Sequence, residues 1–585
     1  MNHLVDVTRA QDAMKPPVAV DDDRLAASIA VHDALLERRG VEIWVGAEPT
    51  FTRADSVEPA WLAASEGDDK LERAYAVAVH LADAIGDASC LRVLGRKYDG
   101  ESTARFAFGV RWPAQPTRGE MDAEPAEPPE TIGDDHWVTV APDPGVVEVH
   151  LAPCSTAAAL STQARQVWAA AARAGLSPVR YRFNGDTADS GGGGQITIGG
   201  PSPMASPFVR YPHVLPALVR YFNNHPSLSY WFAGEHAGSS SQAPRPDEGT
   251  RERWDELGVA LGWLESRADR SRLKPDLLWQ TLSPVLVDAA GNSHRTELNI
   301  EKLWNPYVTR HGLRHGKMGL VELRAIRMPE RPGMMVALAV LVRSIVARLV
   351  VDEYRAPLID WHDELHDQFA LPSALARDLR LVLGDLDEHS LGLPAALRHE
   401  LDAWRTPGVA CHLGDATLTI RPALEFWPLL GDVASQERST ARIVDASTSR
   451  VELAFDGAGP ARIAVAGRWV IPRPLGGGPG SVLDDNCRAI GVRRRVFTPS
   501  PGLHPELPPT DPLVIEWAWA GRTQRIELWG WKPDGSDYAG VPVDASDALA
   551  RRQARIHITT TAGETVAAEG HWPELRPFTV DLRRG

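Results

Sequence analysis

The sequence has few cysteines, and they are far apart. Its four cysteines, Cys90, Cys154, Cys411 and Cys487, form no CxxC pair in a chain of 585 residues. This spacing excludes a disulfide framework and a cysteine zinc site, and it fits a protein of the reducing cytoplasm. The N-terminus lacks an apolar segment followed by a small-residue cleavage site, so we expect no secretory signal.

The sequence also lacks an excess of positive charge and a long uninterrupted apolar run. Its net charge of −15 argues against a nucleic-acid partner bound by bulk positive potential, although a local pocket can still be basic. The longest apolar stretch begins at Met334 and is broken by Arg343 and Arg348, which leaves it too short to span a bilayer. We expect a buried amphipathic helix there and no membrane partner, and the oligomeric state stays open.

The length and composition indicate a globular protein with more than one core. A chain of 585 residues with 43% hydrophobic and 24% charged residues exceeds the size of one domain. We predict an N-terminal tail and helix over 1–40, a main domain over 41–410 and a β-rich domain over 411–585. The Pro- and acid-rich residues 113–135 have little to bury, which predicts a surface loop.

Periodicity predicts an α+β fold. Apolar alternation indicates strands over 41–52, 105–112, 137–151, 195–200, 283–289, 294–300 and 319–326. Helical patterns cover 22–40, 69–85, 155–174, much of 213–282 and most of 334–404. From about residue 413 short alternating strands dominate, which is typical of an antiparallel sandwich.

Four of the predicted strands each carry a carboxylate, namely Glu48, Glu148, Glu297 and Glu322. Alternation places Arg324 on the face of Glu322 and Arg295 on the face of Glu297. The simplest alternative for the Glu322 strand is a half-solvated surface with an ordinary ion pair. Several converging carboxylates are tolerated when Mg²⁺ or Mn²⁺ neutralises them, and neighbouring arginines suit phosphate. The joint pattern therefore indicates a nucleotide and metal site in a sheet-lined cleft.

A run of four glycines, Gly191 to Gly194, precedes the predicted strand at 195–200. Such a run can bring backbone N–H groups close to a ligand, but a flexible linker has the same composition. It matches neither a P-loop nor a dinucleotide-binding fingerprint. Both alternatives, an ordered ligand loop and a linker, remain open.

Several motifs together resemble a known family. ELRAIRMP is similar to the metal- and substrate-binding strand of glutamine synthetase and its relatives, and GAEPTF is similar to their GPEPEF strand. The ordered motifs PDPGVVEV, GGGGQITIGG, FNNHPSLSY, SQAPR, AGNSHRTELNIEKL and MGLVELRAIRMP resemble a bacterial amidoligase family over roughly residues 40 to 540. That family is often joined to a transglutaminase-like domain, which we expect to be absent because about 40 residues precede the first motif.

The resemblance implies a glutamine-synthetase-like antiparallel sheet cleft with packed helices, which joins a carboxylate to an amine with ATP and Mg²⁺ or Mn²⁺. The acceptor would be a small molecule, a peptide or a protein. The implied metal ligands are Glu48, Glu148, Gln195 and Glu322. The implied ATP-binding residues are Gly192, Gly193, Gly194, Arg245 and Arg295. The implied catalytic residues are Arg295, Arg324 and Glu297.

The sequence departs from the family pattern at four positions. Thr50 stands where relatives carry a second carboxylate, and Gln195 where they carry a histidine. Pro422 and Pro428 stand where relatives tend to carry Gln and His, whereas Glu425 is kept.

Two other functions stay open. The first is an inactive binding scaffold with the same fold, and the second is a cysteine acyltransferase that uses Cys154 with His150. For a ligase, the general base is not singled out; the candidates are His225, His236 and His294.

Overall fold

The structure is a computed structural model. It describes residues 18–53, 70–86, 90–96, 105–112, 137–143, 145–267, 273–306, 316–405, 408–432, 442–460, 462–475, 487–498 and 503–584. The predicted loop at 113–135 lies outside these residues.

A four-stranded antiparallel sheet lies at the centre of the chain's first part. Its order is β1 (Trp44–Glu48), β9 (Gln195–Gly199), β12 (Val321–Leu323) and β11 (Leu298–Asn299). The register sets Glu48 opposite Gln195, and Glu322 opposite both Thr197 and Asn299. Ile196, Ile198 and Val321 are fully buried, as the apolar alternation predicts. The register thus gathers polar residues of four strands near one end of the sheet.

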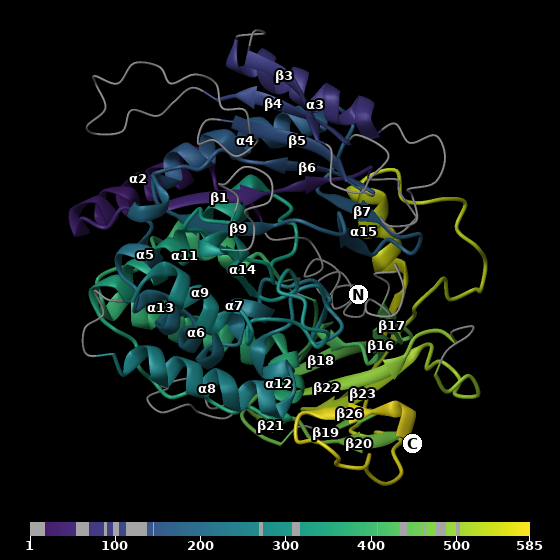
Figure 1. Cartoon of the computed structure of the whole chain (residues 1–585). Helices are drawn as coiled ribbons and strands as arrows, with labels where there is room; N and C mark the ends of the chain where they lie inside the picture. The colour runs from purple at the N-terminus through teal and green to yellow at the C-terminus, as the bar shows by residue number, and fades with distance from the viewer. Residues whose placement is uncertain are drawn as a thin grey trace.

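A second antiparallel sheet adjoins the first, because β1 and β2 belong to one segment that Pro49 interrupts. Its five strands run in the order β2-β6-β5-β4-β3. Their bounds are β2 Thr50–Phe51, β6 Val146–His150, β5 Trp137–Asp143, β4 Arg105–Arg111 and β3 Leu91–Arg96. Helices α3 (Lys70–Ile85) and α4 (Ala157–Arg173) lie beside these strands (Figure 1). β6 therefore passes close to the end of β1.

Helices fill the region between this pair of sheets and the C-terminal part (Figure 1). The first, α2 (Asp22–Arg39), begins at the cap Asp21 and ends at Gly40, whose φ of +67° suits glycine. The others are α5 Pro207–Arg210, α6 Val214–Asn224, α7 Ser227–Tyr230, α8 Arg251–Glu265, α9 Pro275–Leu282, α10 Glu301–Trp304, α11 Pro332–Val351, α12 Glu364–Asp367, α13 Pro372–Glu388 and α14 Ala395–Asp402.

Helix α11 is the one helix of the described residues whose length and composition would suit a membrane span. However, 89% of its most apolar window is buried inside the protein, as in the core helix of a globular fold. The amphipathic character that we predicted is wrong, because every residue from Met334 to Leu349 is buried. Arg343 is accommodated there by an ion pair with Asp33 at 2.7 Å.

Two predicted strands differ in the structure. Residues 283–289 form turns, and of 294–300 only Leu298–Asn299 is a strand. Asp288 Oδ1 accepts hydrogen bonds from the N–H groups of Ala290 and Asn292, and Asn292 Oδ1 accepts one from His294 N. These side chains satisfy the backbone locally and compete with strand pairing.

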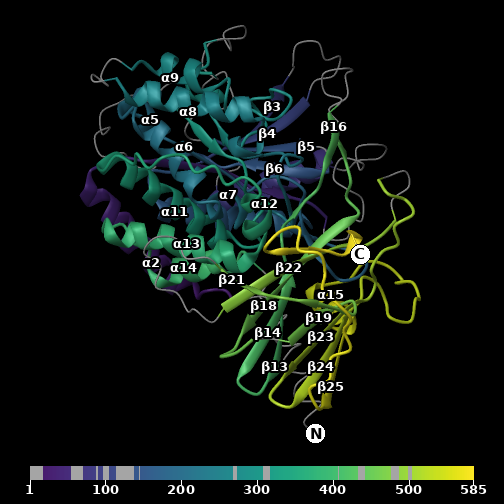
Figure 2. The same ribbon diagram turned by 90° about the horizontal axis from the view of Figure 1, so that it is seen from below.

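The C-terminal part contains two packed sheets, antiparallel except for the pairing of β22 with β26, which confirms the predicted sandwich (Figure 2). One has the order β13-β14-β18-β22-β21, with β26 beside β22, and the other β20-β19-β23-β24-β25. Leu453, Ile490, Ile515 and Trp517 share a core drawn from both sheets. The bounds are β13 Val409–Leu413, β14 Ala416–Pro422, β18 Thr448–Asp456, β19 Arg462–Val465, β20 Arg468–Val470, β21 Arg473–Pro474, β22 Cys487–Arg495, β23 Leu513–Trp519, β24 Arg522–Leu528, β25 Ile556–Ala562 and β26 Thr579–Asp581.

Shorter elements connect the two parts. β15 (Glu425–Phe426) pairs in parallel with β10 (His236–Ala237). β7 (Val179–Tyr181) and β8 (Thr187–Asp189) form a hairpin, and α15 (Ala545–Ala554) packs near it, because Arg552 donates a hydrogen bond to Gly185 O at 2.5 Å. β16 (Leu429–Asp432) pairs with β17 (Arg442–Val444). The domain boundary at residue 410 stays a prediction.

Candidate active site

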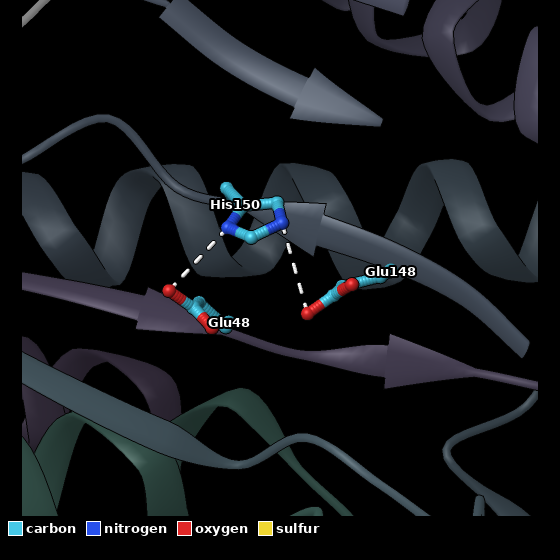
Figure 3. A group of neighbouring side chains, drawn as sticks. All are labelled: Glu48, Glu148 and His150. Carbon is cyan, nitrogen blue, oxygen red and sulfur yellow. Dashed lines mark ion pairs between the residues drawn. The ribbon is translucent and has the colours of Figure 1, made fainter. Parts of the chain in front are cut away.

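Three of the four strand carboxylates converge. Glu48 lies at the end of β1, Glu148 in β6 and Glu322 in β12. His150 stands between the first two, with Nδ1 3.4 Å from Glu48 Oε1 and Nε2 3.7 Å from Glu148 Oε1 (Figure 3). One ligand atom each of Glu48, Glu148 and His150 lies within 4.8 Å of the others. Carboxylate oxygens with an imidazole at this separation suit one divalent cation.

Lys302 and Gln195 join Glu322 to this cluster. Lys302 Nζ of α10 lies 3.6 Å from Glu48 Oε1 and 3.3 Å from Glu322 Oε2. With its amide oriented so that donors face acceptors, Gln195 donates to Glu48 Oε2 at 2.7 Å and to Glu322 Oε1 at 2.8 Å. Its oxygen then accepts from Arg324 Nη2 at 3.1 Å. Gln195 is therefore in the cluster, and metal binding by its oxygen stays a prediction.

The charges of the cluster are mutually stabilising. Burial alone would raise the pKa of Glu48, but the charges of His150, Lys302 and Arg324 outweigh it and hold that pKa below its usual range. Burial alone would lower the pKa of His150, but Glu48 and Glu148 raise it to about 10. The imidazole thus carries a proton here that a metal ion would displace.

Arg324 and Glu322 are buried together. Their side chains are 9% and 4% exposed, and Arg324 Nη1 donates a hydrogen bond to Glu322 Oε1. The alternative of a half-solvated strand with a surface ion pair is therefore wrong. Arg324 Nε is buried without a hydrogen-bond partner among the described residues, so a donor of this guanidinium is left for an anion.

The glycine run is an ordered loop packed against β1 and the segment after β12. Gly193 and Gly194 have φ of +78° and +82°, and Gly194 N donates to Glu48 O at 3.2 Å. A Cβ on Gly194 would overlap the carbonyl of Arg327, whereas one on Gly192 would meet nothing within 4 Å. The linker alternative is therefore wrong for these residues. Close backbone packing explains two of the glycines, and ligand contact by Gly192 to Gly194 stays a prediction.

Thr50 holds this glycine loop in place through hydrogen bonds. Its hydroxyl is buried, lies 2.6 Å from Ser190 Oγ and donates to Gly192 O. Where relatives of the family were expected to place a carboxylate, this chain has a hydroxyl that positions the loop.

The structure places Arg245 and Glu297 in a separate buried network. Arg245 makes five hydrogen bonds, to Asp247, Phe222 O, Asn223 O and Ser229, and these use all five of its donors. Glu297 Oε2 accepts from Ser229 Oγ and lies 4.0 Å from Arg245 Nη1. In this arrangement Arg245 has no donor for a phosphate. Glu297 contacts the site through its backbone, because its O accepts a hydrogen bond from Arg324 N at 2.9 Å.

Arg295 lies in the turn that precedes β11, because its N–H donates to Asn292 O. Its predicted place on one strand face with Glu297 and Asn299 is wrong, since residues 293–297 are not a strand. Its role at a phosphate stays a prediction.

The other candidate residues have partners elsewhere. His225 Nδ1 lies 3.0 Å from Asp378 Oδ1, His236 stacks on Trp427 at 3.4 Å, and His294 Nδ1 lies 3.1 Å from Glu301 Oε2. Glu425 is buried with Arg493 at 2.9 Å. None of these contacts is to the carboxylate cluster.

Cys154 does not suit a nucleophile. It is fully buried, its Sγ accepts from Gln163 Nε2 at 3.1 Å, and burial raises the pKa of its thiol to about 12. A thiol with such a pKa is almost wholly protonated at neutral pH.

The sequence matches the model of a family described as "Putative amidoligase enzyme (DUF2126)" over residues 2–119 and 114–583. The chain belongs to this family. No curated protein matches the chain. A solved structure described as "Crystal structure of novel glutamine synthase homolog" aligns with 14% identity over 65% of this chain and 69% of its own, with a TM-score of 0.30. A likeness at this level carries no argument about the present chain.

Two residues of the carboxylate cluster, His150 and Lys302, were not identified from the sequence as members of this cluster. His150 shares the outward face of β6 with Glu148, two residues away, and this spacing could have indicated it as a ligand. Lys302 follows β11 in the segment NIEKL, and nothing in that pattern indicates that its ammonium reaches Glu48 and Glu322.

Proposed function

We propose that this protein is an ATP-dependent carboxylate–amine ligase that forms an amide or isopeptide bond on an amino acid, a peptide or a protein. The observation that carries the proposal is the convergence of Glu48, Glu148 and Glu322 with His150 and Arg324 in a chain of the amidoligase family. We also propose that it works in a reducing cytoplasm, without nucleic acid or membrane partners. Its cysteines are free, and three of them are buried.

The proposed chemistry removes an obstacle in amide formation. A carboxylate is a poor acyl donor because its leaving group would be oxide. Transfer of the γ-phosphoryl group of ATP to a carboxylate oxygen releases ADP and gives an acyl phosphate. The amine then attacks the carbonyl carbon, inorganic phosphate leaves, and the proton of the attacking nitrogen passes to a base.

The residues present fit a divalent cation. The donor set of Glu48, Glu148 and His150, with Glu322 nearby, offers hard oxygen ligands and one imidazole, which suits Mg²⁺ and suits Mn²⁺ better. When bound, such an ion would offset the charge of the ATP phosphates. Arg324 is held by Glu322 and keeps an Nε donor without a partner among the described residues, while Lys302 Nζ pairs with Glu322 at 3.3 Å and holds it in place.

Two observations favour an inactive scaffold as the second candidate. Thr50 replaces a carboxylate by a hydroxyl that is already bonded, and Lys302 neutralises two of the remaining carboxylates. A scaffold would bind nucleotide or peptide without turnover.

ATP turnover separates the two candidates. Hydroxylamine serves as a generic amine, and the assay measures ADP together with hydroxamate formed from pools of amino acids and peptides with Mg²⁺ or Mn²⁺. We expect both products from the wild type and from Glu516→Gln, a control that removes a partly exposed ion pair with Arg525 at 2.9 Å. Loss of both products is expected for Glu48→Gln. Nucleotide binding without ADP or hydroxamate from any pool would establish the scaffold instead.

A further inference from the structure

Two arginines outside the carboxylate cluster meet beside residues 230–235. Arg327 N donates to Phe232 O at 2.9 Å, and its guanidinium lies 5.7 Å above the ring of Trp404 and donates to Trp404 O. Arg405, the residue after Trp404, donates a hydrogen bond to Tyr230 O. Both side chains are half-buried. Each guanidinium is thus anchored to a backbone carbonyl, and the two are close enough for Arg327 to act electrostatically on Arg405.

The charge of this pair is not balanced. No carboxylate within the described parts of the chain lies within ion-pair distance of Arg327 or Arg405, and the Nε atoms of both are buried without a partner there. Burial and the neighbouring Arg327 lower the pKa of Arg405 to about 9. Glu235, a carboxylate whose charge acts on Arg405, is already 3.5 Å from a third arginine, Arg182. Arg327 and Arg405 therefore lack a carboxylate partner of their own among the described residues, in a protein whose net charge is −15.

The arginine pair is linked to the proposed active site through the backbone of Arg327. Arg327 follows Arg324 by three residues, and its carbonyl lies where a Cβ of Gly194 would be. The next residue, Gln195, bonds both Glu48 and Glu322. The backbone of Arg327 therefore packs against the glycine loop that borders the carboxylates.

We propose that Arg327 and Arg405 form a binding site for a carboxylate group of the substrate, separate from the carboxylate that is activated. The proposal rests on the proposed ligase function and names part of its substrate class: an acid with a second carboxylate, such as the α-carboxylate of an amino acid or the C-terminus of a peptide. Each guanidinium is half-buried, bonded to one backbone carbonyl and without a carboxylate partner in the described residues, so its remaining donors suit a planar carboxylate. An anion there would reduce the mutual repulsion of the pair. ATP phosphates are expected on the other side of the loop, at Arg324 and the metal ligands.

The test uses glutarate as the probe on the full chain, without nucleotide or metal. Thermal unfolding is followed against glutarate concentration, with inorganic phosphate and with chloride at equal ionic strength. The variants are Arg327→Gln and Arg405→Gln. The control is Arg468→Gln, because Arg468 is also half-buried over a tryptophan, at 4.7 Å from the ring of Trp572.

We expect a saturable glutarate response in the wild type and the control, with an apparent Kd at least about tenfold weaker in both site variants, as for loss of a charged hydrogen bond. Without anion, Arg405→Gln should melt no lower than the wild type, because it relieves repulsion. Lower melting with an unchanged glutarate response would show a structural role and overturn the proposal. A response to phosphate alone that ATP suppresses would assign the pair to nucleotide and overturn it equally.

A parallel titration with ATP and Mg²⁺ keeps the two proposals apart. If every variant still responds to ATP–Mg²⁺ and the wild type does not respond to glutarate, only the proposed carboxylate site is refuted. If the wild type does not respond to ATP–Mg²⁺, the proposed ligase function itself is refuted.

Discussion

Glu322 and Arg324 stand two residues apart at the end of β12 and have separable roles. Glu322 touches Lys302, Gln195 and Arg324, so its charge belongs to the carboxylate cluster. Arg324 retains a buried donor, which suits an anion that reaches the cluster. Substitutions at the two positions should therefore affect different measured quantities.

Glu322→Gln should weaken metal-dependent ATP binding, whereas Arg324→Ala should leave that binding largely in place and slow turnover. Loss of a charged contact in the transition state costs about 2 to 4 kcal/mol, or roughly two to three decades in rate. Arg324→Lys should not restore the rate, because a point charge cannot replace a planar fork. ADP release and nucleotide affinity are measured for each variant. Wild-type values for both Glu322→Gln and Arg324→Ala would show that this strand has no part in the function.

Glu297 should make stability depend on pH near neutrality. Burial raises its pKa to about 7, and the charge of Arg245 offsets only part of this effect. The pKa of Glu297 is higher in the folded than in the unfolded protein. Its contribution to the free energy of unfolding is therefore fully present below the unfolded pKa and is lost as pH rises to about 7. The slope reaches at most about 1.4 kcal/mol per pH unit.

Glu297→Gln should remove this fall in urea-unfolding free energy between about pH 4.5 and pH 7. Glu301→Gln is the control, because a hydrogen bond from His294 lowers the pKa of Glu301 to about 2 and its contribution is lost only as pH falls below the usual carboxyl range. A slope that persists in Glu297→Gln would assign the effect to another group.

The residue types of the site could be predicted from the sequence, but their partners could not. Arg245 and Arg324 both lie in motifs of the family. All donors of Arg245 are bonded inside the protein, whereas Arg324 has a donor without a partner among the described residues. The difference arises from Asp247, two residues beyond Arg245, which holds its guanidinium with two hydrogen bonds. The contact of Lys302 with two strands depends on tertiary packing, which local sequence does not specify.

At the scale of elements, the glycine loop gives a matched pair of substitutions. Gly194→Ala combines a positive φ with overlap against the carbonyl of Arg327, whereas Gly192→Ala meets open space. We expect Gly194→Ala to lower the unfolding free energy by about 1 to 3 kcal/mol and to weaken ATP–Mg²⁺ binding. Gly192→Ala should change the unfolding free energy by less than about 1 kcal/mol. Equal urea-unfolding curves for the two variants would refute the packing explanation of the loop.

Strands with strong apolar alternation could be predicted, as β1, β6, β9 and the C-terminal sheets show. Prediction failed at 283–297, where apolar residues follow Pro284 but Asp288 and Asn292 bond the local backbone. Individual side-chain hydrogen bonds decide there whether the chain forms a turn or a strand, and the composition of the segment does not show which of these bonds form.

At the scale of the whole molecule, charge is unevenly distributed. The net charge is −15, yet Arg327 and Arg405 have no carboxylate partner in the described residues, and the backbone of Arg327 packs against the glycine loop beside the carboxylate cluster. Neighbouring regions of opposite sign suit the proposed binding of a divalent cation, a nucleotide and an acidic substrate.

ATP with Mg²⁺ should stabilise the whole chain against thermal unfolding. A ligand that binds only the folded state adds RT ln(1 + [L]/Kd), about 2.7 kcal/mol at a hundredfold excess over Kd. Scanning calorimetry with and without EDTA measures the effect. No shift with any nucleotide at millimolar concentration would count against a nucleotide site.

The most direct test of the central claim is a crystal structure with Mn²⁺ and a non-hydrolysable ATP analogue, in which anomalous scattering locates the metal. We expect Mn²⁺ at about 2 to 2.5 Å from oxygens of Glu48 and Glu148 and from a nitrogen of His150, with the analogue's phosphates next to Arg324. Mn²⁺ bound elsewhere, or nucleotide bound with no metal at these three residues, would contradict the claim that the converging carboxylates form the catalytic centre.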